Sequence, residues 1–143
     1  MEWNPLKLEN QLCFPLYACA KELVKKYKPF LDELNLTYTQ YITMMVLWEH
    51  NSLNVKTLGK RLYLDSGTLT PLLKKLENEG LVTRTRSAGD ERELIVSLTE
   101  KGVQLREKAS EIPGKIGACI DLPTEDLVKL HEILHKLLKQ AGG

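Results

Sequence analysis

The stretch LDSGTLTPLLKKLENEGLVTRTRSAGDERELIVSL, residues 64–98, decides the fold. In its first half, Asp65 is a natural N-cap, and four leucines follow it at helical spacing. They are Leu69, Leu72, Leu73 and Leu76. After Gly80, which is typical of a helix stop, two runs of alternating apolar and polar residues flank the polar segment 87–92. The stretch therefore predicts a helix followed directly by a β-hairpin.

The predicted helix has a polar face opposite its leucines, because Ser66, Thr70 and Lys74 fall four residues apart. A shorter helix over residues 54–62 precedes it. This order of a short helix, a polar-faced helix and a basic hairpin is typical of a winged helix-turn-helix. Its second helix can enter the major groove of DNA, and the hairpin arginines can reach phosphates or the minor groove. For any single lysine a solvated surface is the simpler interpretation, but the order of the elements favours DNA binding.

The rest of the chain is predicted to be helical. Periodic apolar residues predict a helix over residues 16–33, which Pro29 should bend or end, and a more apolar segment over 37–50 predicts a buried helix. After the hairpin comes a helix that Pro113 and its neighbouring glycine loosen, and then a last helix that Thr124 caps. The fold class is therefore mainly α-helical with a small β-hairpin wing (α+β).

Composition limits the class of protein. The chain has 143 residues, 43% of them hydrophobic and 27% charged, which is typical of one soluble domain. No apolar run approaches the roughly 20 residues that span a bilayer, and the N-terminus has no export signal. Three cysteines are too few and too uneven in spacing for a disulfide framework. We therefore expect a cytoplasmic protein with free thiols and no membrane partner.

The charge of the chain is unevenly distributed. The net charge is only +1, but residues 56–92 carry eight Lys or Arg against five acidic residues, a surplus of three. The rest carries twelve against fourteen, a deficit of two. This distribution indicates a local anion-binding surface in the middle of the chain.

The segments DSGTLTPLLKKLE, GLVTR and DER follow one another as in the MarR family of winged-helix transcriptional regulators, which the sequence resembles. With LENQLCF (8–14) and LTYTQYITMMVLWEH (36–50), the chain is similar over nearly its whole length to the OhrR branch, which senses organic hydroperoxides. The resemblance implies a homodimer that binds an inverted-repeat operator in double-stranded DNA. Such a repressor controls a peroxide-detoxifying gene and needs no cofactor.

Within a single domain over residues 1–143, the resemblance implies three parts. Residues 1–36 would form the N-terminal sensing and dimerisation helix, 37–98 the DNA-binding lobe, and 99–143 the C-terminal dimerisation helices. The expected DNA-contacting residues are Ser66, Thr68, Thr70, Lys74, Lys75, Arg84, Arg86 and Arg92. Asp90 and Arg92 match a pair that braces the wing in this family.

The same resemblance makes Cys13 the peroxide-reactive thiol. Tyr27 and Tyr38 match phenols that reach the thiolate from the partner subunit, and Tyr17 lies beside this group. The spacing adds independent support, because Cys13 and Tyr17 share a helix face if the helix includes both. Pro15 departs from the aliphatic residue expected there. Since its ring would clash with the carbonyl four residues back, we expect the helix to start near residue 14, with Cys13 at its positive end.

Cys119 matches the position of the second thiol in two-cysteine members of this branch. The resemblance therefore implies an intersubunit disulfide between Cys13 and Cys119 after oxidation to a sulfenic acid. The alternative is that Cys119, close to Ile116 and Ile120, is a buried small apolar residue. Cys19 lies on a different helix face from Cys13 and is expected to be structural.

Three other functions compete with this interpretation. HEILH, His131–His135, satisfies the H-E-x-x-H pattern, in which His131 and His135 bind zinc and Glu132 activates water. No third ligand follows it, so we expect a coincidental pair, no metal site and no enzyme. A thiol peroxidase would use Cys13 in the same way but would have no need for a DNA-binding lobe. A MarR-type repressor released by a small phenolic ligand is the closest alternative.

Overall fold

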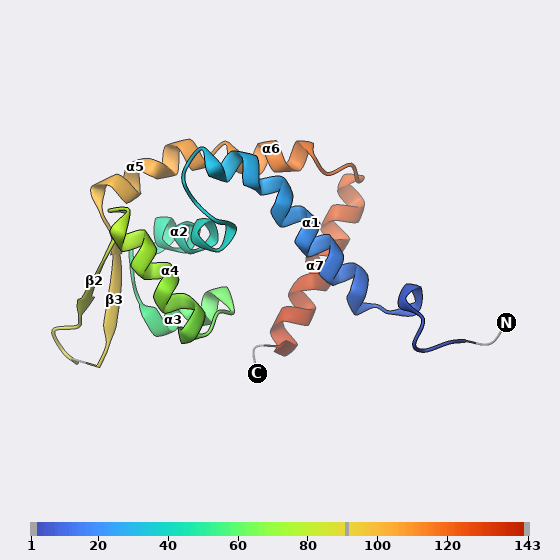
Figure 1. The fold of residues 1–143 in the computed structure, drawn as a ribbon, viewed down its shortest axis with the longest axis horizontal. Coiled ribbons are helices and arrows are strands. Elements are labelled where there is room, and N and C mark those ends of the chain that lie inside the picture. Colours follow the sequence, from blue (N-terminus) through green and yellow to red (C-terminus); the bar gives the residue numbers. More distant parts are fainter. Residues whose placement is uncertain (1–2, 91, 142–143) are drawn as a thin grey trace.

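The computed structural model describes residues 3–90 and 92–141, and the lobe predicted to be a winged helix-turn-helix occupies the middle of that chain (Figure 1). Its elements follow in the predicted order, with one additional strand, β1. They are α2 (Tyr38–His50), β1 (Ser52–Asn54), α3 (Val55–Leu62), α4 (Ser66–Asn78), β2 (Val82–Arg86) and β3 (Leu94–Leu98). Before the lobe come a turn of 3-10 helix, η1 (Leu8–Asn10), and α1 (Cys13–Asp32). After it come α5 (Glu100–Ala109), α6 (Ile112–Ala118) and α7 (Thr124–Ala141).

Side-chain caps explain why the lobe's helices begin where they do. Thr37 and Gln40 form a capping box at the start of α2, and Asn54 accepts from the amide of Lys56 at 2.7 Å at the start of α3. Asp65 caps α4, and Gly80 follows that helix with a φ of 76°, a left-handed conformation that favours glycine.

The core of the lobe lies between α4 and the helices and strands packed around it. All four leucines of the predicted stripe on α4 are buried, together with apolar residues of α2, α3, β2 and β3. The fully buried side chains include Met44, Leu47, Leu58, Leu69, Leu73, Leu76, Val82 and Val96. Since apolar burial is the main stabilising contribution to a fold, this cluster holds α4 with its polar face outward.

The structure differs from the sequence predictions in four places. The wing is a three-stranded sheet of order β1-β3-β2, because β1 pairs antiparallel with β3 and Leu53 lies opposite Val96. The helix after the wing is two helices, since Pro113 stands in the first turn of α6 rather than loosening a continuous helix. Pro29 does not end α1, which continues to Asp32, and Thr124 is the first residue of α7 rather than its cap.

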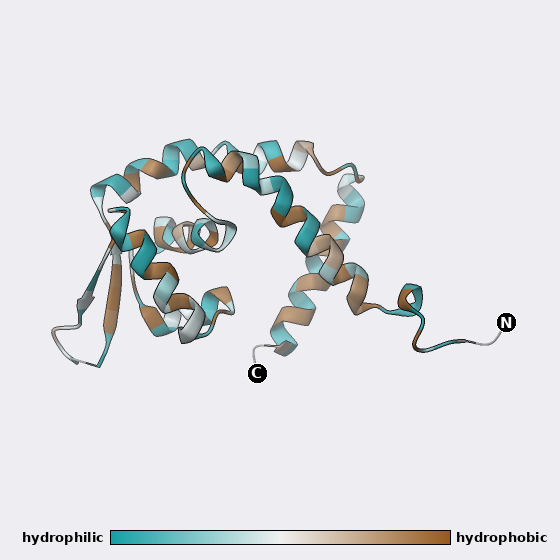
Figure 2. Cartoon of the chain, in the orientation of Figure 1, coloured by the Kyte–Doolittle hydropathy of each residue, from teal (hydrophilic) through white to brown (hydrophobic). Residues whose placement is uncertain are grey.

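Two long helices leave the lobe with apolar residues uncovered. The N-terminal part of α1 projects away from the lobe, and α7 has no buried residue (Figures 1 and 2). One contact ties α7 back, from the Tyr63 hydroxyl to the Leu138 carbonyl at 3.5 Å. No helix in residues 3–90 and 92–141 is long and apolar enough to cross a membrane.

Candidate DNA-binding surface and thiol site

The polar face of α4 is held outward by the leucines beneath it and by its N-cap. The Asp65 carboxylate accepts from the amide of Thr68 at 2.8 Å. Hydrogen bonds from Thr68 hold the pKa of Asp65 below its usual value, so the cap is charged at neutral pH. The expected DNA-contacting side chains of α4 are all exposed. They are Ser66, Thr68, Thr70, Lys74 and Lys75.

The wing has one exposed basic strand and a braced tip. In β2, Arg86 is exposed, whereas Arg84 is partly buried. At the tip, the Asp90 carboxylate accepts from the main-chain amide of Arg92 at 2.9 Å. Among the ion pairs of the described residues, none joins the side chains of Asp90 and Arg92, and the Arg92 side chain is exposed.

Arg84 is paired within the chain, with Glu77 of α4. Its guanidinium Nη2 donates to Glu77 Oε1 at 3.3 Å, and its main-chain amide donates to Glu77 Oε2 at 3.1 Å. The bonds from Arg84 hold the pKa of Glu77 below its usual value. Glu77 therefore fixes the wing relative to α4, a role that the sequence prediction missed and that leaves less of the Arg84 charge for DNA.

Replacing Glu77 with glutamine is expected to weaken this junction in a pH-dependent way. Because the pKa of Glu77 is lower in the folded state, its contribution to stability is present above the unfolded value, about 4.3, and is lost as pH falls through the folded value. Urea titrations should therefore show a wild-type advantage that is constant from about pH 6 to 7 and shrinks below about pH 4. An advantage that does not depend on pH would contradict this account.

A wide groove runs between α3, the start of α4 and the tip of the wing. Its volume is about 1130 Å³, and Lys56, Lys60, Ser66 and Arg92 are among its lining residues. The side chain of Asn54 donates to the Glu93 carboxylate and so joins the start of α3 to the wing. Asp65, Asp90 and Glu93 line the groove as well. The candidate surface for a polyanion therefore consists of the exposed lysines of α4 together with Lys56, Lys60 and Arg92 at this groove.

Cys13 is the first residue of α1, which agrees with the prediction from Pro15. The Cys13 side chain is exposed. Its neighbours Leu12 and Phe14 are also exposed, Leu12 to 84%, and they place apolar surface on either side of it. The helix includes both Cys13 and Tyr17, so the condition for a shared face is met.

The predicted phenols gather at the other end of α1. The rings of Tyr27 and Tyr38 meet edge to face with centroids 4.9 Å apart. Tyr41, which the prediction missed although it lies three residues after Tyr38, completes a cluster at 5.8 Å from Tyr27 and is only 3% exposed. Burial raises the pKa of all three phenols, so they stay protonated at neutral pH and can donate hydrogen bonds.

Cys13 and this tyrosine cluster do not meet within one chain. At 1.5 Å per residue, Cys13 and Tyr27 lie about 21 Å apart along α1. By contrast, Tyr17 is 64% exposed and lies one turn from Cys13. A single protomer therefore holds the thiol and the cluster at opposite ends of the same helix.

The other cysteines are exposed as well. Cys119 follows the last turn of α6, where its sulfur lies 3.3 Å from the Lys115 carbonyl, and it is exposed in the single chain. The Lys26 ammonium donates to the Cys119 carbonyl at 3.3 Å and ties the end of α6 to α1. Cys19 is exposed too, although we expected a structural residue.

The two histidines of the HEILH motif stack on the exposed surface of α7. Their ring centroids lie 4.1 Å apart, and His135 Nδ1 lies 2.9 Å from the His131 carbonyl oxygen. Across residues 3–90 and 92–141, no three or more potential ligands gather as a metal site would require. The HEILH motif therefore offers two possible zinc ligands, and no third potential ligand lies beside them in the described residues.

Comparison with known proteins places this arrangement in a family. A family model for the transcriptional regulator SarA/Rot matches residues 25–109. The organic hydroperoxide resistance transcriptional regulator of Bacillus subtilis (strain 168) is 54% identical over 138 residues, which cover 96% of this chain and 94% of the relative. The chain belongs to the MarR family of winged-helix transcriptional regulators, in the OhrR branch.

Solved structures agree with the assignment to the MarR family. AbfR of Staphylococcus epidermidis is 38% identical, and its reduced form bound to DNA superposes with a TM-score of 0.78 over 94% of both chains. AbfR has also been solved overoxidised on DNA and with a disulfide, with TM-scores of 0.76 and 0.66. NadR in complex with 4-hydroxyphenylacetate is 26% identical, with a TM-score of 0.73 over 97% of this chain and 98% of NadR.

The family assignment confirms the predicted fold class and the coarse function. This MarR-family protein is a DNA-binding transcriptional regulator with a winged-helix lobe. Its relatives are regulators rather than enzymes, which confirms that the protein is not an enzyme and argues against a zinc hydrolase or a thiol peroxidase.

Proposed function

We propose that the protein is a homodimeric repressor that releases its operator when an organic hydroperoxide oxidises Cys13. The observation that carries this proposal is the exposed Cys13 thiol, set among apolar side chains at the start of α1. Apolar neighbours suit the alkyl or aryl group of an organic peroxide. The relationship to the Bacillus subtilis regulator supports the same signal.

The uncovered faces of α1 and α7 support a dimer. Exposed apolar side chains recur along both helices, and α7 buries none of its own residues. On α7 they are Val128, Leu130, Ile133, Leu137 and Leu138. Large exposed apolar patches mark interaction surfaces. A second copy of the chain would cover them and would place two α4 helices in successive major grooves, about 34 Å apart.

In this dimer the thiol and the phenols meet across the interface. Cys13 lies too far from Tyr27 and Tyr38 of its own chain, so those of the partner subunit would donate to it, with Tyr17 nearby. The thiolate attacks the terminal oxygen of the hydroperoxide, an S–O bond forms and the O–O bond breaks. Sulfur is oxidised to a sulfenic acid, and the departing alkoxide takes up a proton to become an alcohol. Cys119 of the other chain then forms a disulfide with the sulfenic acid and releases water.

Substituting Lys74 with alanine is expected to weaken binding to every DNA sequence and to flatten its salt dependence. Each lost phosphate contact lowers the slope of log K against log salt by about 0.9. Fluorescence anisotropy of an upstream DNA fragment across a salt series measures both effects. Lys129→Ala, an exposed lysine on α7 outside the DNA-binding surface, is the matched control and should leave the slope unchanged. Equal slopes for both variants would remove Lys74 from the interface.

A gel shift tests the proposed function, with the DNA upstream of the protein's own gene as the probe and cumene hydroperoxide as the oxidant. Wild-type protein should lose its shifted band on oxidation. Cys13→Ser should bind the same DNA and keep its band at the same peroxide concentration. If the mutant is released as readily as wild type, Cys13 is not the sensor.

A repressor released by a small phenolic ligand is the second candidate, and a cavity favours it. The cavity, of about 270 Å³, lies between α2, α5 and α6, and Tyr41, Trp48 and Arg106 are among its lining residues. The aromatic walls suit a single-ring compound, and the lining holds both a cation, Arg106, and an anion, Glu49, to meet its polar groups. Release of both wild type and Cys13→Ser by 4-hydroxyphenylacetate without peroxide would favour this candidate.

A further inference from the structure

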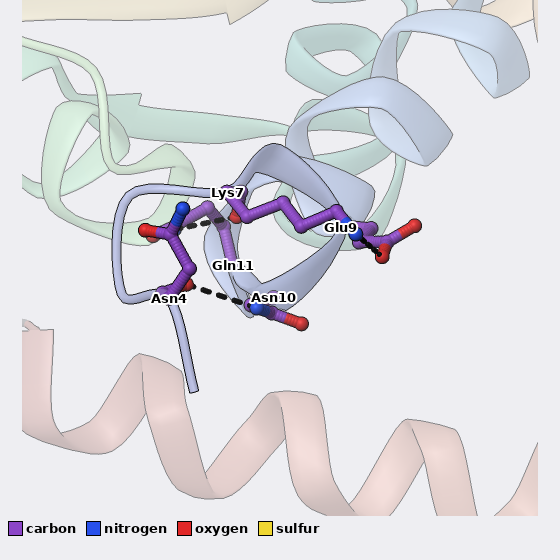
Figure 3. Close-up of polar contacts among 5 residues, drawn as sticks. All are labelled: Asn4, Lys7, Glu9, Asn10 and Gln11. Carbon is purple, nitrogen blue, oxygen red and sulfur yellow. Dashed lines mark hydrogen bonds and ion pairs between the residues drawn. The ribbon is translucent and has the colours of Figure 1, made fainter. Parts of the chain in front are cut away.

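The segment directly before Cys13 is folded by its own amide side chains. We call residues 4–11 the N-terminal turn (Figure 3). The Asn10 side chain donates to the Asn4 carbonyl at 2.9 Å. The Gln11 side chain donates to two carbonyls, those of Pro5 at 2.6 Å and Lys7 at 2.9 Å. Gln11 therefore closes the turn from within.

Pro15 makes this closure necessary. Its ring excludes a helical carbonyl four residues back, at Gln11, and the backbone leaves the helix there with φ −85° and ψ 135°. The helix therefore cannot continue through Gln11 to stabilise what precedes it. Main-chain bonds from Asn10 to Lys7 and from Gln11 to Leu8 hold the turn locally, and the side chain of Gln11 adds two bonds that tie its end to its beginning.

In the described part of the chain, the N-terminal turn makes no hydrogen bond or ion pair with residues outside it. Each of its hydrogen bonds, and the ion pair between Lys7 and Glu9, joins two of its own residues. Apolar side chains in and beside the turn do not anchor it either, since Leu6 is 91% exposed and Leu12 is 84% exposed. Without the amide closure, residues 4–12 would lose their single conformation and the first turn of α1 would fray.

We propose that Gln11 is a positioning residue for the Cys13 thiol. By closing the N-terminal turn it fixes where α1 begins, and thereby the place of the sulfur relative to the phenols of the partner subunit. This inference rests on the proposed function, in which Cys13 reacts with the peroxide. Reactions that depend on aligned groups are sensitive to small displacements, and a shift of about 1 Å can cost up to about 100-fold in rate.

The test is the rate at which each cysteine is oxidised or alkylated in the reduced protein. Gln11→Glu keeps the size of the side chain and removes both donors, and Gln11→Ala removes the side chain. Both should slow the reaction of Cys13 with cumene hydroperoxide about 10-fold or more. Glu9→Gln, which breaks only the exposed ion pair with Lys7, is the matched control and should react at the wild-type rate.

Cys19 serves as the internal control, because it is exposed, lies outside the turn and takes no part in the proposed disulfide. Mass spectrometry of alkylated peptides should show the rate at Cys19 unchanged in the Gln11 variants, along with thermal midpoint and DNA affinity. Wild-type rates at Cys13 in both variants would overturn the inference, and so would equal slowing at Cys13 and Cys19. Failure of the proposed function is separate, because it would appear as peroxide release of Cys13→Ser.

Discussion

Oxidised protein is expected to run as a covalent dimer on a non-reducing gel, and Cys119→Ser is expected to remove that band. Cumene hydroperoxide supplies the oxidant, and the reduced protein serves as the reference. Cys13→Ser should abolish the band as well, because the disulfide needs both thiols. Cys19→Ser is the matched control and should keep the band.

The geometry of one chain argues against a disulfide between Cys13 and Cys119 of the same chain. The Cys119 carbonyl lies 3.3 Å from the ammonium of Lys26. Lys26 lies about 20 Å along α1 from Cys13. One lysine side chain is far shorter than this separation, and a disulfide needs Cα atoms about 4.4–6.8 Å apart. A bond between Cys13 and Cys119 therefore has to join two chains, unless α6 leaves α1.

Two outcomes would contradict this expectation. A monomeric product with an internal Cys13–Cys119 peptide link would mean that α6 separates from α1 on oxidation. The second outcome is a mixed disulfide between Cys13 and a small thiol that is added together with the oxidant, seen as the corresponding increase in mass. It would mean that Cys119 does not resolve the sulfenic acid. Peptide mapping by mass spectrometry distinguishes both products from the intersubunit bond.

The sequence predicted the elements whose signals are local. Leucine spacing and the Asp65 cap define α4, and the alternation after Gly80 defines the wing strands. The strand β1 was missed because it has three residues and exists through pairing of Leu53 with the distant Val96. Short strands formed by contacts far apart in sequence carry little periodic signal of their own.

The same division applies to the candidate site. Pro15 alone indicated where α1 begins, because proline geometry is a local constraint. The link between Glu77 and Arg84 was missed because alternation in β2 tells which residues share a face, but not which face packs on α4. Tyr41 had a local signal, three residues after Tyr38 in one helix, that the prediction did not use.

Gly102→Ala, in α5, is expected to destabilise the protein by about 3 kcal/mol. A Cβ at Gly102 would lie 2.2 Å from the Leu81 carbonyl oxygen and 3.2 Å from its carbonyl carbon. These are backbone atoms, which cannot rotate away as a flexible side chain would. The Leu81 oxygen also accepts from the Thr99 amide at 3.1 Å, so α5 must move and that bond must weaken.

A second contact makes this shift costly. The Trp48 indole donates to the Gly102 carbonyl at 2.8 Å, so moving α5 also disturbs the junction with α2. Alanine favours helix by about 1 kcal/mol over glycine, which offsets part of the loss. Gly117→Ala in α6 isolates that gain, because a Cβ there meets nothing within 4 Å and should leave stability equal or slightly higher.

Urea titration of the reduced proteins at one protomer concentration measures both variants, since a dimer's stability depends on concentration. Gly102→Ala should have a clearly lower midpoint than wild type, while Gly117→Ala should not. A midpoint for Gly102→Ala at or above that of wild type would mean that α5 can move away from Leu81 without loss. The wing and α5 would then be less tightly joined than the close approach at Gly102 requires.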